Sequence, residues 1–351
     1  MVKKIISFLL MFSVCTLRVS ALTADSVSAE CAVVMNVQTG EVLFSKNPDK
    51  RRSMASTTKI MTSLIAIESG KLQSEIIISE IMSKVEGTSM GLLPGDSVSL
   101  DELVYGMMLP SGNDAANATA IFLGKSTEKF ALMMNERAEQ LGMNNTNFVT
   151  ASGLDDDEHY STAYDMALLG SFAVRNPKFV SVCSSQKATV SFGNPPYLRT
   201  LYNHNKLLGN YDYAMGIKTG FTKKSGRCLV SYAKKDSAEF VAVTLNAPDD
   251  WNDHMLMFDY AFSVSEYEEI SPELPDEISV VGGNLDSVEI FSEKFSYAFS
   301  KMKNLHCRIY LEKFAYAPVS KGTVVGHCDY YLGDELKIVK PIVITESVMQ
   351  R

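Results

Sequence analysis

The most constraining feature of this sequence is an apolar run that directly follows Ser56-Thr57-Thr58-Lys59. Over residues 60–67 the apolar side chains recur at helical spacing, and a glycine then ends the run. We therefore predict a largely buried helix over residues 56–69, with Ser56 in its first turn. Residues three apart share a helix face, so Lys59 should lie above Ser56. A desolvated lysine can take the proton of such a hydroxyl, and the N–H groups of a first turn favour an oxyanion beside it.

The Ser-x-x-Lys spacing alone has little specificity. It occurs four more times in the chain, at Ser126/Lys129, Ser184/Lys187, Ser231/Lys234 and Ser300/Lys303. A helix N-terminus followed by a surface lysine explains any single match equally well. Only the match at Ser56 introduces a strongly apolar helix, so its chemical meaning depends on what accompanies it along the chain.

Two further motifs follow the first in a fixed order. Ser111-Gly112-Asn113 lies on a Pro-Ser-Gly break between helical patterns, which is a turn that can direct side chains into a cleft. Lys218-Thr219-Gly220 lies on a predicted strand edge, where a lysine, a hydroxyl and a residue without Cβ let a ligand carboxylate approach the backbone. In this order, Ser-x-x-Lys, Ser-x-Asn and Lys-Thr-Gly form the signature of penicillin-binding proteins and serine β-lactamases.

The order of the predicted elements indicates an α+β fold. A β-hairpin over residues 31–45 comes first, and two antiparallel strands at 227–233 and 239–245 come last, with a closing helix at 251–262. We expect one sheet to combine strands from both ends of this segment. Between them, helical patterns cover residues 56–69, 101–109, 114–122, 126–141 and 162–174.

The last part of the chain has a different character. Residues 271–276 have the composition of a linker, and short strand patterns follow it. These patterns lie at residues 278–283, 288–291, 308–311, 322–326, 335–339 and 342–345. We therefore divide the chain into a leader over residues 1–21, an α+β domain over 22–268 and a β-rich domain over 269–351.

The leader has the composition of a secretory signal peptide. Lys3 and Lys4 precede an apolar run over residues 5–15, and small residues at positions 19–21 offer a cleavage site. The apolar run is shorter than a membrane span requires. An uncleaved N-terminal anchor is the alternative, and both interpretations predict export to the cell envelope, with the protein either secreted or associated with the membrane.

Charge and metal-ligating residues exclude several classes of function. The net charge of -8 argues against a nucleic acid as partner. Five of the six cysteines lie beyond the leader, and neither they nor the five histidines show metal-ligand spacing, so we expect no metal and no cofactor. Because five is odd, at least one thiol should be free or pair between chains. Whether Cys307 and Cys328 form a bridge is left open.

Beyond its motifs, the chain resembles the D-alanyl-D-alanine carboxypeptidases, the low-molecular-mass penicillin-binding proteins of peptidase family S11. The resemblance extends over nearly all of residues 30–262, and the β-rich end resembles the small C-terminal domain of those enzymes. The segments that carry it are residues 51–68, 92–120, 148–167, 203–208 and 216–230. It implies a penicillin-binding and β-lactamase-like transpeptidase domain, followed by a small all-β domain.

The resemblance also implies roles for the residues of the first two motifs. Ser56 would be the nucleophile that forms an acyl-enzyme, with Lys59 as its general base. Ser111 would relay a proton to the departing D-alanine, and Asn113 would bind the substrate amide.

For the third motif, the resemblance implies substrate binding. Lys218 and Thr219 would recognise the terminal carboxylate, and Gly220 would keep the strand edge open. The backbone N–H groups of Ser56 and Phe221 would form the oxyanion hole.

Four other residues match family segments without an implied catalytic role. We interpret His159 and Asp165 as structural, and Asn205 and Lys206 as part of the cleft wall.

The function implied is that of a serine D,D-carboxypeptidase in cell-wall biogenesis and cell shape. It would remove the terminal D-alanine from peptidoglycan stem peptides through an acyl-serine intermediate, and β-lactam antibiotics would acylate and inhibit it. A serine β-lactamase is one alternative. The Glu-x-x-x-Asn base of class A enzymes is absent between Asn113 and Lys218, which predicts slow deacylation of penicillin. A catalytically inactive wall-binding or sporulation scaffold is the other alternative, and the presence of every motif residue argues against it.

Membrane attachment is less well indicated. The amphipathic C-terminal helix usual in the family is not evident in residues 344–351, so peripheral association with the membrane or the cell wall stays open. The sequence also leaves open a vegetative or sporulation role, the oligomeric state, and the balance between carboxypeptidase and transpeptidase activity.

Overall fold

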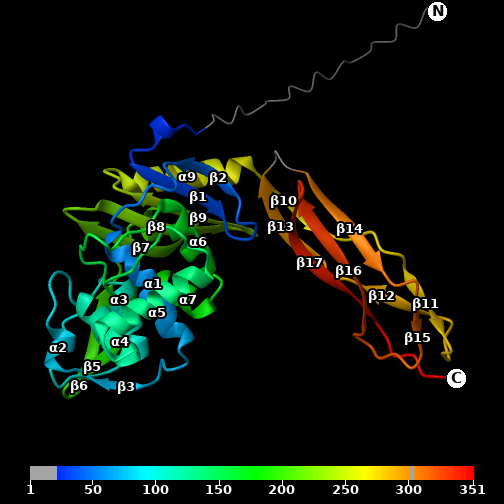
Figure 1. Cartoon of the computed structure of the whole chain (residues 1–351), viewed down its shortest axis with the longest axis horizontal. Helices are drawn as coiled ribbons and strands as arrows, with labels where there is room; N and C mark the ends of the chain where they lie inside the picture. Colours follow the sequence, from blue (N-terminus) through cyan, green and yellow to red (C-terminus); the bar gives the residue numbers. More distant parts are fainter. Residues whose placement is uncertain (1–21, 301–303) are drawn as a thin grey trace, which may run out of the picture.

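In a computed structural model, the chain forms an α+β domain and an elongated all-β domain beside it (Figure 1). The structure describes residues 22–300 and 304–351, so the predicted signal peptide lies outside the described residues. The predicted α+β fold class and the all-β C-terminal domain are both confirmed.

A five-stranded antiparallel sheet organises the α+β domain. Its strands are β1 (Cys31–Asn36), β2 (Val42–Lys46), β7 (Ala214–Thr222), β8 (Gly226–Lys235) and β9 (Ala238–Leu245). They lie in the order β2-β1-β9-β8-β7, so the N-terminal hairpin joins the C-terminal strands as predicted. Side chains alternate along β1: Ala32 and Val34 belong to one core, whereas Val33 and Met35 belong to the other. The sheet therefore separates two hydrophobic cores.

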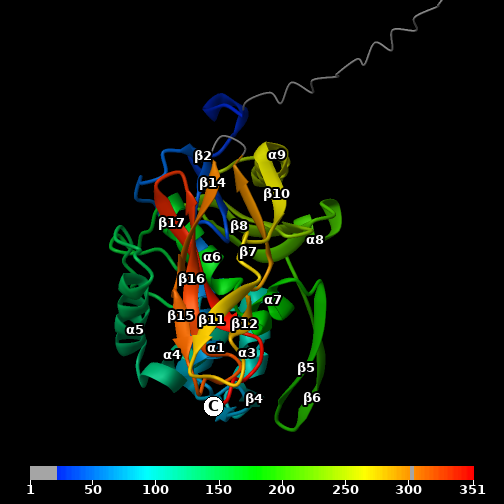
Figure 2. The same cartoon turned by 90° about the vertical axis from the view of Figure 1, so that its right-hand side faces the viewer.

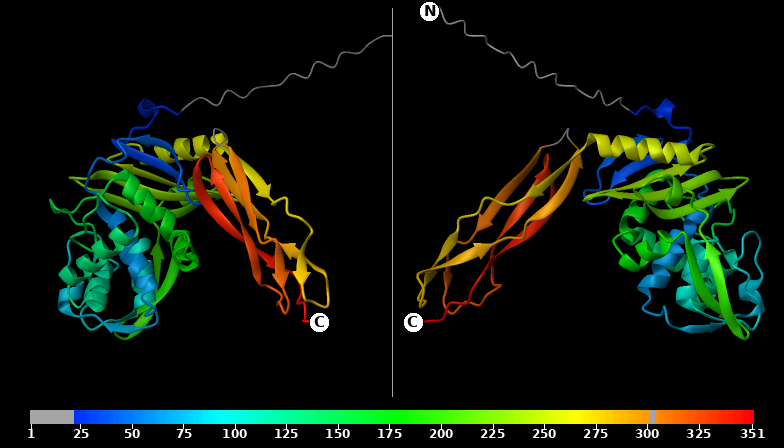
Figure 3. Two further views of the ribbon diagram at one scale, coloured as in Figure 1. Left: turned by 45° about the vertical axis from the view of Figure 1, so that its right-hand side comes forward. Right: turned by 180° about the vertical axis from the view of Figure 1, so that it is seen from behind.

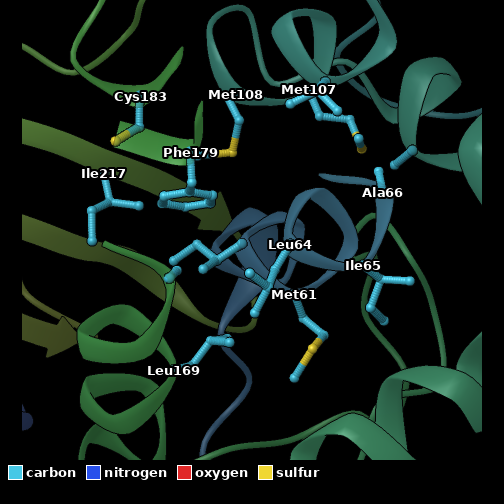
Figure 4. Packing of buried hydrophobic residues seen from close by; sticks show 14 of the residues in the cluster. Met61, Leu64, Ile65, Ala66, Met107, Met108, Leu169, Phe179, Cys183 and Ile217 are labelled. Carbon is cyan, nitrogen blue, oxygen red and sulfur yellow. The ribbon is translucent and has the colours of Figure 1, made fainter. Parts of the chain in front are cut away.

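Helices cover both faces of this sheet. The helix α9 (Asp250–Val264) covers one face, and the remaining larger helices lie on the opposite face (Figure 3). Helix α1 (Lys59–Glu68) lies at the centre of the larger core. Its Met61 and Leu64 belong to the same hydrophobic cluster as Phe179 and Ile217 (Figure 4). The other helices are α2 (Glu80–Ser83), α3 (Leu100–Met108), α4 (Asn113–Gly124), α5 (Thr127–Gln140), α6 (Ala163–Ala173), α7 (Pro177–Cys183) and α8 (Leu207–Asn210).

The predicted helix over residues 56–69 begins later than expected, which corrects the sequence interpretation. A 3-10 helix, η2 (Ala55–Thr58), comes first, and the α-helix starts at Lys59. The hydroxyls of Thr57 and Thr58 donate to the carbonyls of Met54 and Ala55, three residues back, and so stabilise the tighter turn. Ser56 therefore lies in a 3-10 turn that leads directly into α1.

A second, smaller sheet lies at the far end of the helical part. It contains β3 (Glu75–Ile77), β4 (Ser97–Ser99), β5 (Lys187–Gly193) and β6 (Pro196–Tyr202) in that order. The β5–β6 hairpin extends along the side of the domain (Figure 2). Neither β3 nor β4 is apparent in the sequence, because three residues carry too short an alternation to indicate a strand.

The all-β domain combines a six-stranded sheet with a two-stranded one. Its strands are β10 (Ser265–Ile270), β11 (Glu277–Val281), β12 (Ser287–Phe291), β13 (Phe295–Ser300), β14 (Leu305–Leu311), β15 (Phe314–Tyr316), β16 (Val324–Leu332) and β17 (Glu335–Ile344). The larger sheet has the order β14-β16-β17-β12-β11-β15, and β10 pairs with β13. The two strands predicted at 335–339 and 342–345 are one strand, because the pairing of β17 with β16 continues through Pro341.

The two domains meet near the connection between α9 and β10. The strand β10 spans the predicted division between residues 268 and 269, and residues 271–276 follow it without regular structure. Between the domains, Lys337 Nζ donates to the carbonyl oxygen of Thr39 at 2.9 Å. None of the helices in the described part of the chain has the length and apolar composition needed to cross a membrane.

Candidate active site

The first motif brings Lys59 back over Ser56. Lys59 Nζ lies 2.9 Å from Ser56 Oγ, as the three-residue spacing predicts. The same nitrogen donates to Asn113 Oδ1 and to the carbonyl oxygen of Ser152, both at 2.7 Å. The side chain of Lys59 is completely buried. One buried nitrogen therefore joins the first motif, the second motif and the segment that contains Ser152.

The surroundings of Lys59 favour its neutral form. Burial, reinforced by the charge of Lys218, holds the pKa of Lys59 well below its usual value, and Asp114 opposes this shift. A neutral amine has two hydrogens and one lone pair. Because Asn113 Oδ1 and Ser152 O only accept, they take the two hydrogens. The lone pair is then directed to the Ser56 hydroxyl, which is the arrangement of a general base.

The second motif forms the turn between α3 and α4. Ser111 has a φ of +65°, in the left-handed region, and Asn113 is the first residue of α4. The Thr88 hydroxyl donates to the Ser111 carbonyl at 2.6 Å, and Asn113 N–H donates to the Thr88 carbonyl at 2.7 Å. Asn113 Nδ2 donates to the Glu86 carbonyl at 2.6 Å, so its Oδ1 faces Lys59.

Asp114, for which the sequence motifs predicted no role, holds the segment that contacts this turn. Its carboxylate is completely buried and accepts from Met90 N–H and Leu92 N–H at 2.9 and 3.0 Å. It also accepts from Gly91 N–H and from the Ser89 hydroxyl. The sequence contains one signal for this role: an acidic residue directly after Ser-x-Asn, in the first turn of a helix.

The third motif lies on β7, at the edge of the sheet beside η2. A Cβ atom on Gly220 would lie 3.0 Å from Ser56 N and 3.1 Å from the carbonyl oxygen of Met54, so glycine allows this close approach. The two segments that meet here contain the N–H groups of the predicted oxyanion hole, Ser56 and Phe221. The side chain of Lys218 is 1% exposed, and its Nζ donates to the carbonyl oxygen of Thr219 at 3.0 Å. Burial lowers the pKa of Lys218 to about 7.

These segments surround a cleft of about 350 Å³. It is lined by Ser56, Thr88, Ser111, His204, Lys206, Thr219, Gly220, Phe221, Arg227, Asp250 and Trp251. Lys59, Asn113 and Lys218 do not line it, although Asn113 and Lys218 were predicted to bind the substrate. Of the two residues predicted for the cleft wall, Lys206 is present, whereas Asn205 is buried and accepts from Leu207 N–H.

His159 ties the segment before Ser152 to η2. Its Nδ1 accepts from Val149 N–H at 2.9 Å, and its Nε2 lies 2.8 Å from Thr58 Oγ1. Because the Thr58 hydroxyl donates to the Ala55 carbonyl, the imidazole donates through Nε2. Burial lowers the pKa of His159 to about 4, so the ring is neutral. These contacts support the structural interpretation of His159.

Asp165 has similar structural contacts. Its carboxylate accepts from Asn145 N–H at 2.8 Å and from the Thr146 hydroxyl at 2.7 Å. Both bonds hold the loop before residue 148 against the N-terminus of α6, so they too support the structural interpretation.

Metal-ligating side chains do not cluster in the described part of the chain. Within residues 22–300 and 304–351, no group of three or more histidine, cysteine or acidic side chains could hold a metal ion. In the same residues, five cysteines are free thiols: Cys31, Cys183, Cys228, Cys307 and Cys328.

The fold and the site together define a class of enzyme. Ser56 faces the lone pair of the buried Lys59, and Ser-x-Asn and the strand-edge Lys-Thr-Gly lie beside them. This arrangement is the active site of an acyl-serine enzyme of the penicillin-binding and β-lactamase-like class. The family profile described as D-alanyl-D-alanine carboxypeptidase matches residues 18–249. A second profile, described as the C-terminal domain of penicillin-binding protein 5, matches residues 272–350. The chain belongs to the D-alanyl-D-alanine carboxypeptidase family.

Individual relatives resemble the chain over both domains. D-alanyl-D-alanine carboxypeptidase DacF of Bacillus subtilis is 32% identical over 341 residues, which cover 91% of this chain and 86% of that protein. The solved structure of D-alanyl-D-alanine carboxypeptidase DacD from Francisella tularensis has a TM-score of 0.67 at 30% identity, covering 95% and 96% of the two chains. Penicillin-binding protein 5 from Haemophilus influenzae has a TM-score of 0.69 at 28% identity, covering 94% of this chain and 100% of that one.

Proposed function

We propose that this protein is a serine D,D-carboxypeptidase in which Ser56 is the nucleophile and Lys59 is the general base. The substrate is a peptidoglycan stem peptide that ends in D-alanyl-D-alanine, and the product is the same peptide shortened by one D-alanine. The family membership supports the reaction, and the contacts of Lys59 support the assignment of the residues. The observation that carries the proposal is the contact of Lys59 Nζ with Ser56 Oγ, Asn113 Oδ1 and Ser152 O.

The reaction follows from this geometry in two steps. The Ser56 oxygen attacks the carbonyl carbon of the peptide bond between the two D-alanines while its proton passes to Lys59. The N–H groups of Ser56 and Phe221 stabilise the oxyanion. The C–N bond then breaks, and the proton reaches the departing amine through Ser111, which leaves an acyl ester on Ser56. Attack by water on the ester releases the shortened peptide and restores Ser56.

The same serine accounts for inhibition by β-lactams. Opening of a β-lactam ring by Ser56 leaves an ester of the same kind. The segment between Asn113 and Lys218 lacks the Glu-x-x-x-Asn sequence of class A β-lactamases, so the penicilloyl ester should persist. Slow release of this ester distinguishes the carboxypeptidase from a β-lactamase.

The place of action is part of the proposal. We infer that residues 1–21 direct export, so that the enzyme acts in the cell envelope and contributes to cell-wall biogenesis and cell shape. Processing at the small residues 19–21 is checked by sequencing the N-terminus of the exported protein. A retained leader would instead support an N-terminal anchor.

The test combines intact mass with product analysis. Residues 22–351 are incubated with benzylpenicillin beside a Ser56→Ala variant, and D-alanine release from a peptide ending in D-alanyl-D-alanine is measured for both. A persistent single adduct and D-alanine release, both absent in the variant, are expected. Rapid penicillin destruction without a persistent adduct would support the β-lactamase. Intact penicillin with unmodified protein and no D-alanine release would leave only the scaffold.

A further inference from the structure

The all-β domain has one long open edge. Strand β14 (Leu305–Leu311) forms an edge of the six-stranded sheet and pairs with β16 alone among the described residues (Figure 1). The opposite edge strand, β15, has only three residues. Folded proteins usually shorten an edge strand or place proline in it, because its unpaired N–H and C=O groups can pair with another chain. β14 has seven residues without a proline, and residues 306–310 are exposed, so this edge can accept a further strand.

The register of the β14–β16 ladder shows which backbone groups point outward. At one end of β14, Glu312 N–H donates to the Val325 carbonyl at 2.9 Å. At the other end, Gly333 N–H donates to the Asn304 carbonyl at 3.1 Å. Hydrogen-bonded and non-hydrogen-bonded pairs alternate along an antiparallel ladder, so the even-numbered residues of β14 bond to β16. The odd-numbered residues therefore direct their N–H and C=O groups away from the sheet.

A cavity of about 530 Å³ lies beside this edge. It is lined by Leu305, Cys307 and Ile309 of β14 and by residues 269–273 at the end of β10. Tyr330 also lines it, and the buried hydroxyl of this tyrosine has no nitrogen or oxygen partner among the described residues. Alternate side chains of a strand share one face. A strand added to β14 would therefore direct every second side chain toward the cavity.

The cavity is suited to a segment that is both apolar and basic. Glu269 and Glu273 line it and are exposed, and they lie beside the apolar side chains of Ile270 and Ile309. A lysine or arginine at the end of an added strand would meet these carboxylates, whereas an acidic residue would be repelled. The chemistry of this surface therefore selects among extended segments.

A second copy of this chain fits the edge poorly. Antiparallel pairing of β14 with its own copy over the full strand would place Arg308 opposite Arg308 of the second copy, and like charges directly opposite destabilise a sheet. The net charge of -8 also opposes self-association. Both charges favour a different, basic chain as the occupant.

We propose that β14 binds an extended segment of another protein by strand addition. The segment carries apolar side chains at alternate positions, which enter the cavity, and a lysine or arginine that faces Glu269 and Glu273. The backbone bonds to β14 supply affinity, and the cavity supplies specificity. This inference is independent of the proposed function, because neither β14 nor the cavity contains a residue of the candidate active site.

The binding test uses the designed peptide Lys-Thr-Val-Thr-Val-Thr-Lys, acetylated, amidated and labelled with fluorescein. Its lysines and valines share one face in either direction of pairing. It should bind residues 22–351 saturably in anisotropy measurements. The reordered peptide Lys-Val-Val-Thr-Thr-Thr-Lys, and the first peptide with glutamate in place of both lysines, should bind at least about 10-fold more weakly. Equal binding of all three peptides, or no binding below about 1 mM, would overturn the proposal.

Hydrogen exchange of the β14 amides, followed by NMR, tests the mode of binding. The designed peptide should slow exchange at Cys307 and Ile309, whose N–H groups point outward. Exchange at Arg308 should change little, because its N–H already bonds to β16. Exchange rates in β14 that the peptide leaves unchanged would contradict strand addition.

A proline at position 309 tests the edge without breaking the ladder. Ile309→Pro removes one outward N–H and no bond to β16, so it should weaken peptide binding by about 10-fold while the protein unfolds near the wild-type temperature. Ile309→Val is the matched control and should bind as the wild type does. Wild-type affinity in Ile309→Pro would overturn the proposal.

A second variant tests the charge of the cavity and does not depend on the proline. Glu269→Gln/Glu273→Gln changes two exposed side chains, and it should lose the preference for the lysine peptide over the glutamate peptide. An unchanged preference would contradict the assigned role of these carboxylates, even if Ile309→Pro proved unstable.

Sedimentation of residues 22–351 without peptide tests the alternative occupant. A monomer is expected. A dimer that Ile309→Pro dissociates would identify a second copy of the chain as the occupant and would overturn the proposal of a different protein.

Discussion

Gly153 lies so close to Ala55 that a Cβ atom on Gly153 would be 1.9 Å from the Ala55 carbonyl oxygen. This contact joins the residue after Ser152, whose carbonyl accepts from Lys59, to the residue before Ser56. The position of the general base therefore depends on two backbone segments that pack without a side chain between them.

We expect Gly153→Ala to reduce both stability and acylation. The methyl group must displace the backbone of η2, and a φ of +83° adds strain, so the free energy of unfolding should fall by at least about 2 kcal/mol. Gly142→Ala is the matched control, because Gly142 has a φ of +76° with nothing within 4 Å of the added Cβ. Urea unfolding and the rate of benzylpenicillin acylation measure the two effects. Equal losses in both variants would contradict the role of the contact.

The protonation state of Lys59 should set the acid limb of the pH–rate profile. Acylation requires the neutral amine, so the rate falls as the pH drops through the pKa of Lys59. Because burial holds that pKa well below 10.5, the limb should lie far below the range of an ordinary lysine. Lys59→Met should lower the acylation rate by about 10²- to 10⁴-fold and remove the limb. A limb near pH 10 in the wild-type protein would contradict the lowered pKa, and a limb that persists in Lys59→Met would show that Lys59 is not the base.

Removing the charge of Asp114 should loosen the segment that supports Ser111. Asp114→Asn keeps one side-chain oxygen as an acceptor and replaces the other with an amide NH2 group. Backbone N–H groups of residues 90–92 then lose a hydrogen-bond partner. The free energy of unfolding should fall by about 2–3 kcal/mol, and KM for the peptide should rise. Asp286→Asn is the control, because Asp286 forms an exposed ion pair with Arg351 in the other domain. Unchanged stability of Asp114→Asn would contradict this account.

Acid should destabilise the protein partly through His159. Its pKa is about 4 in the folded protein against 6.5 for an ordinary histidine, so the unfolded chain binds a proton that the folded chain excludes. The contribution of His159 to the free energy of unfolding is fully present above pH 6.5. It is lost as the pH falls toward 4, by about 3 kcal/mol in total. His159→Gln should flatten the stability curve between pH 7 and pH 4, measured by urea unfolding. His306→Gln is the control, because His306 is exposed, and it should keep the wild-type dependence of stability on pH. The same dependence in the wild-type protein and both variants would refute the role of His159.

Local patterns in the sequence predicted the parts of the site that depend on spacing within one element. Ser56 and Lys59 lie three residues apart in successive helical turns, so they meet whether the first turn is 3-10 or α. Lys-Thr-Gly was predicted at a strand edge, and β7 is an edge strand of the sheet. Apolar periodicity predicted α1, and two strand patterns around a glycine turn predicted the hairpin of β1 and β2. The resemblance to a known family then supplied the roles of the motif residues and the transpeptidase type of α+β fold.

Only the tertiary structure decided the contacts between segments that are distant in the chain. The Ser152 carbonyl is a backbone group and has no sequence pattern, yet it orients Lys59. Asp114 and Arg227 are ordinary charged residues in the sequence, and their partners at residues 90–92 and at Asp250 become neighbours only when the helices and the sheet pack. Burial is also a property of the packed chain, and it lowers the pKa of Lys59 and of Lys218. The sequence by itself therefore determined which groups could react, because their spacing is local, whereas packing decided which of them are neutral and which face the cleft.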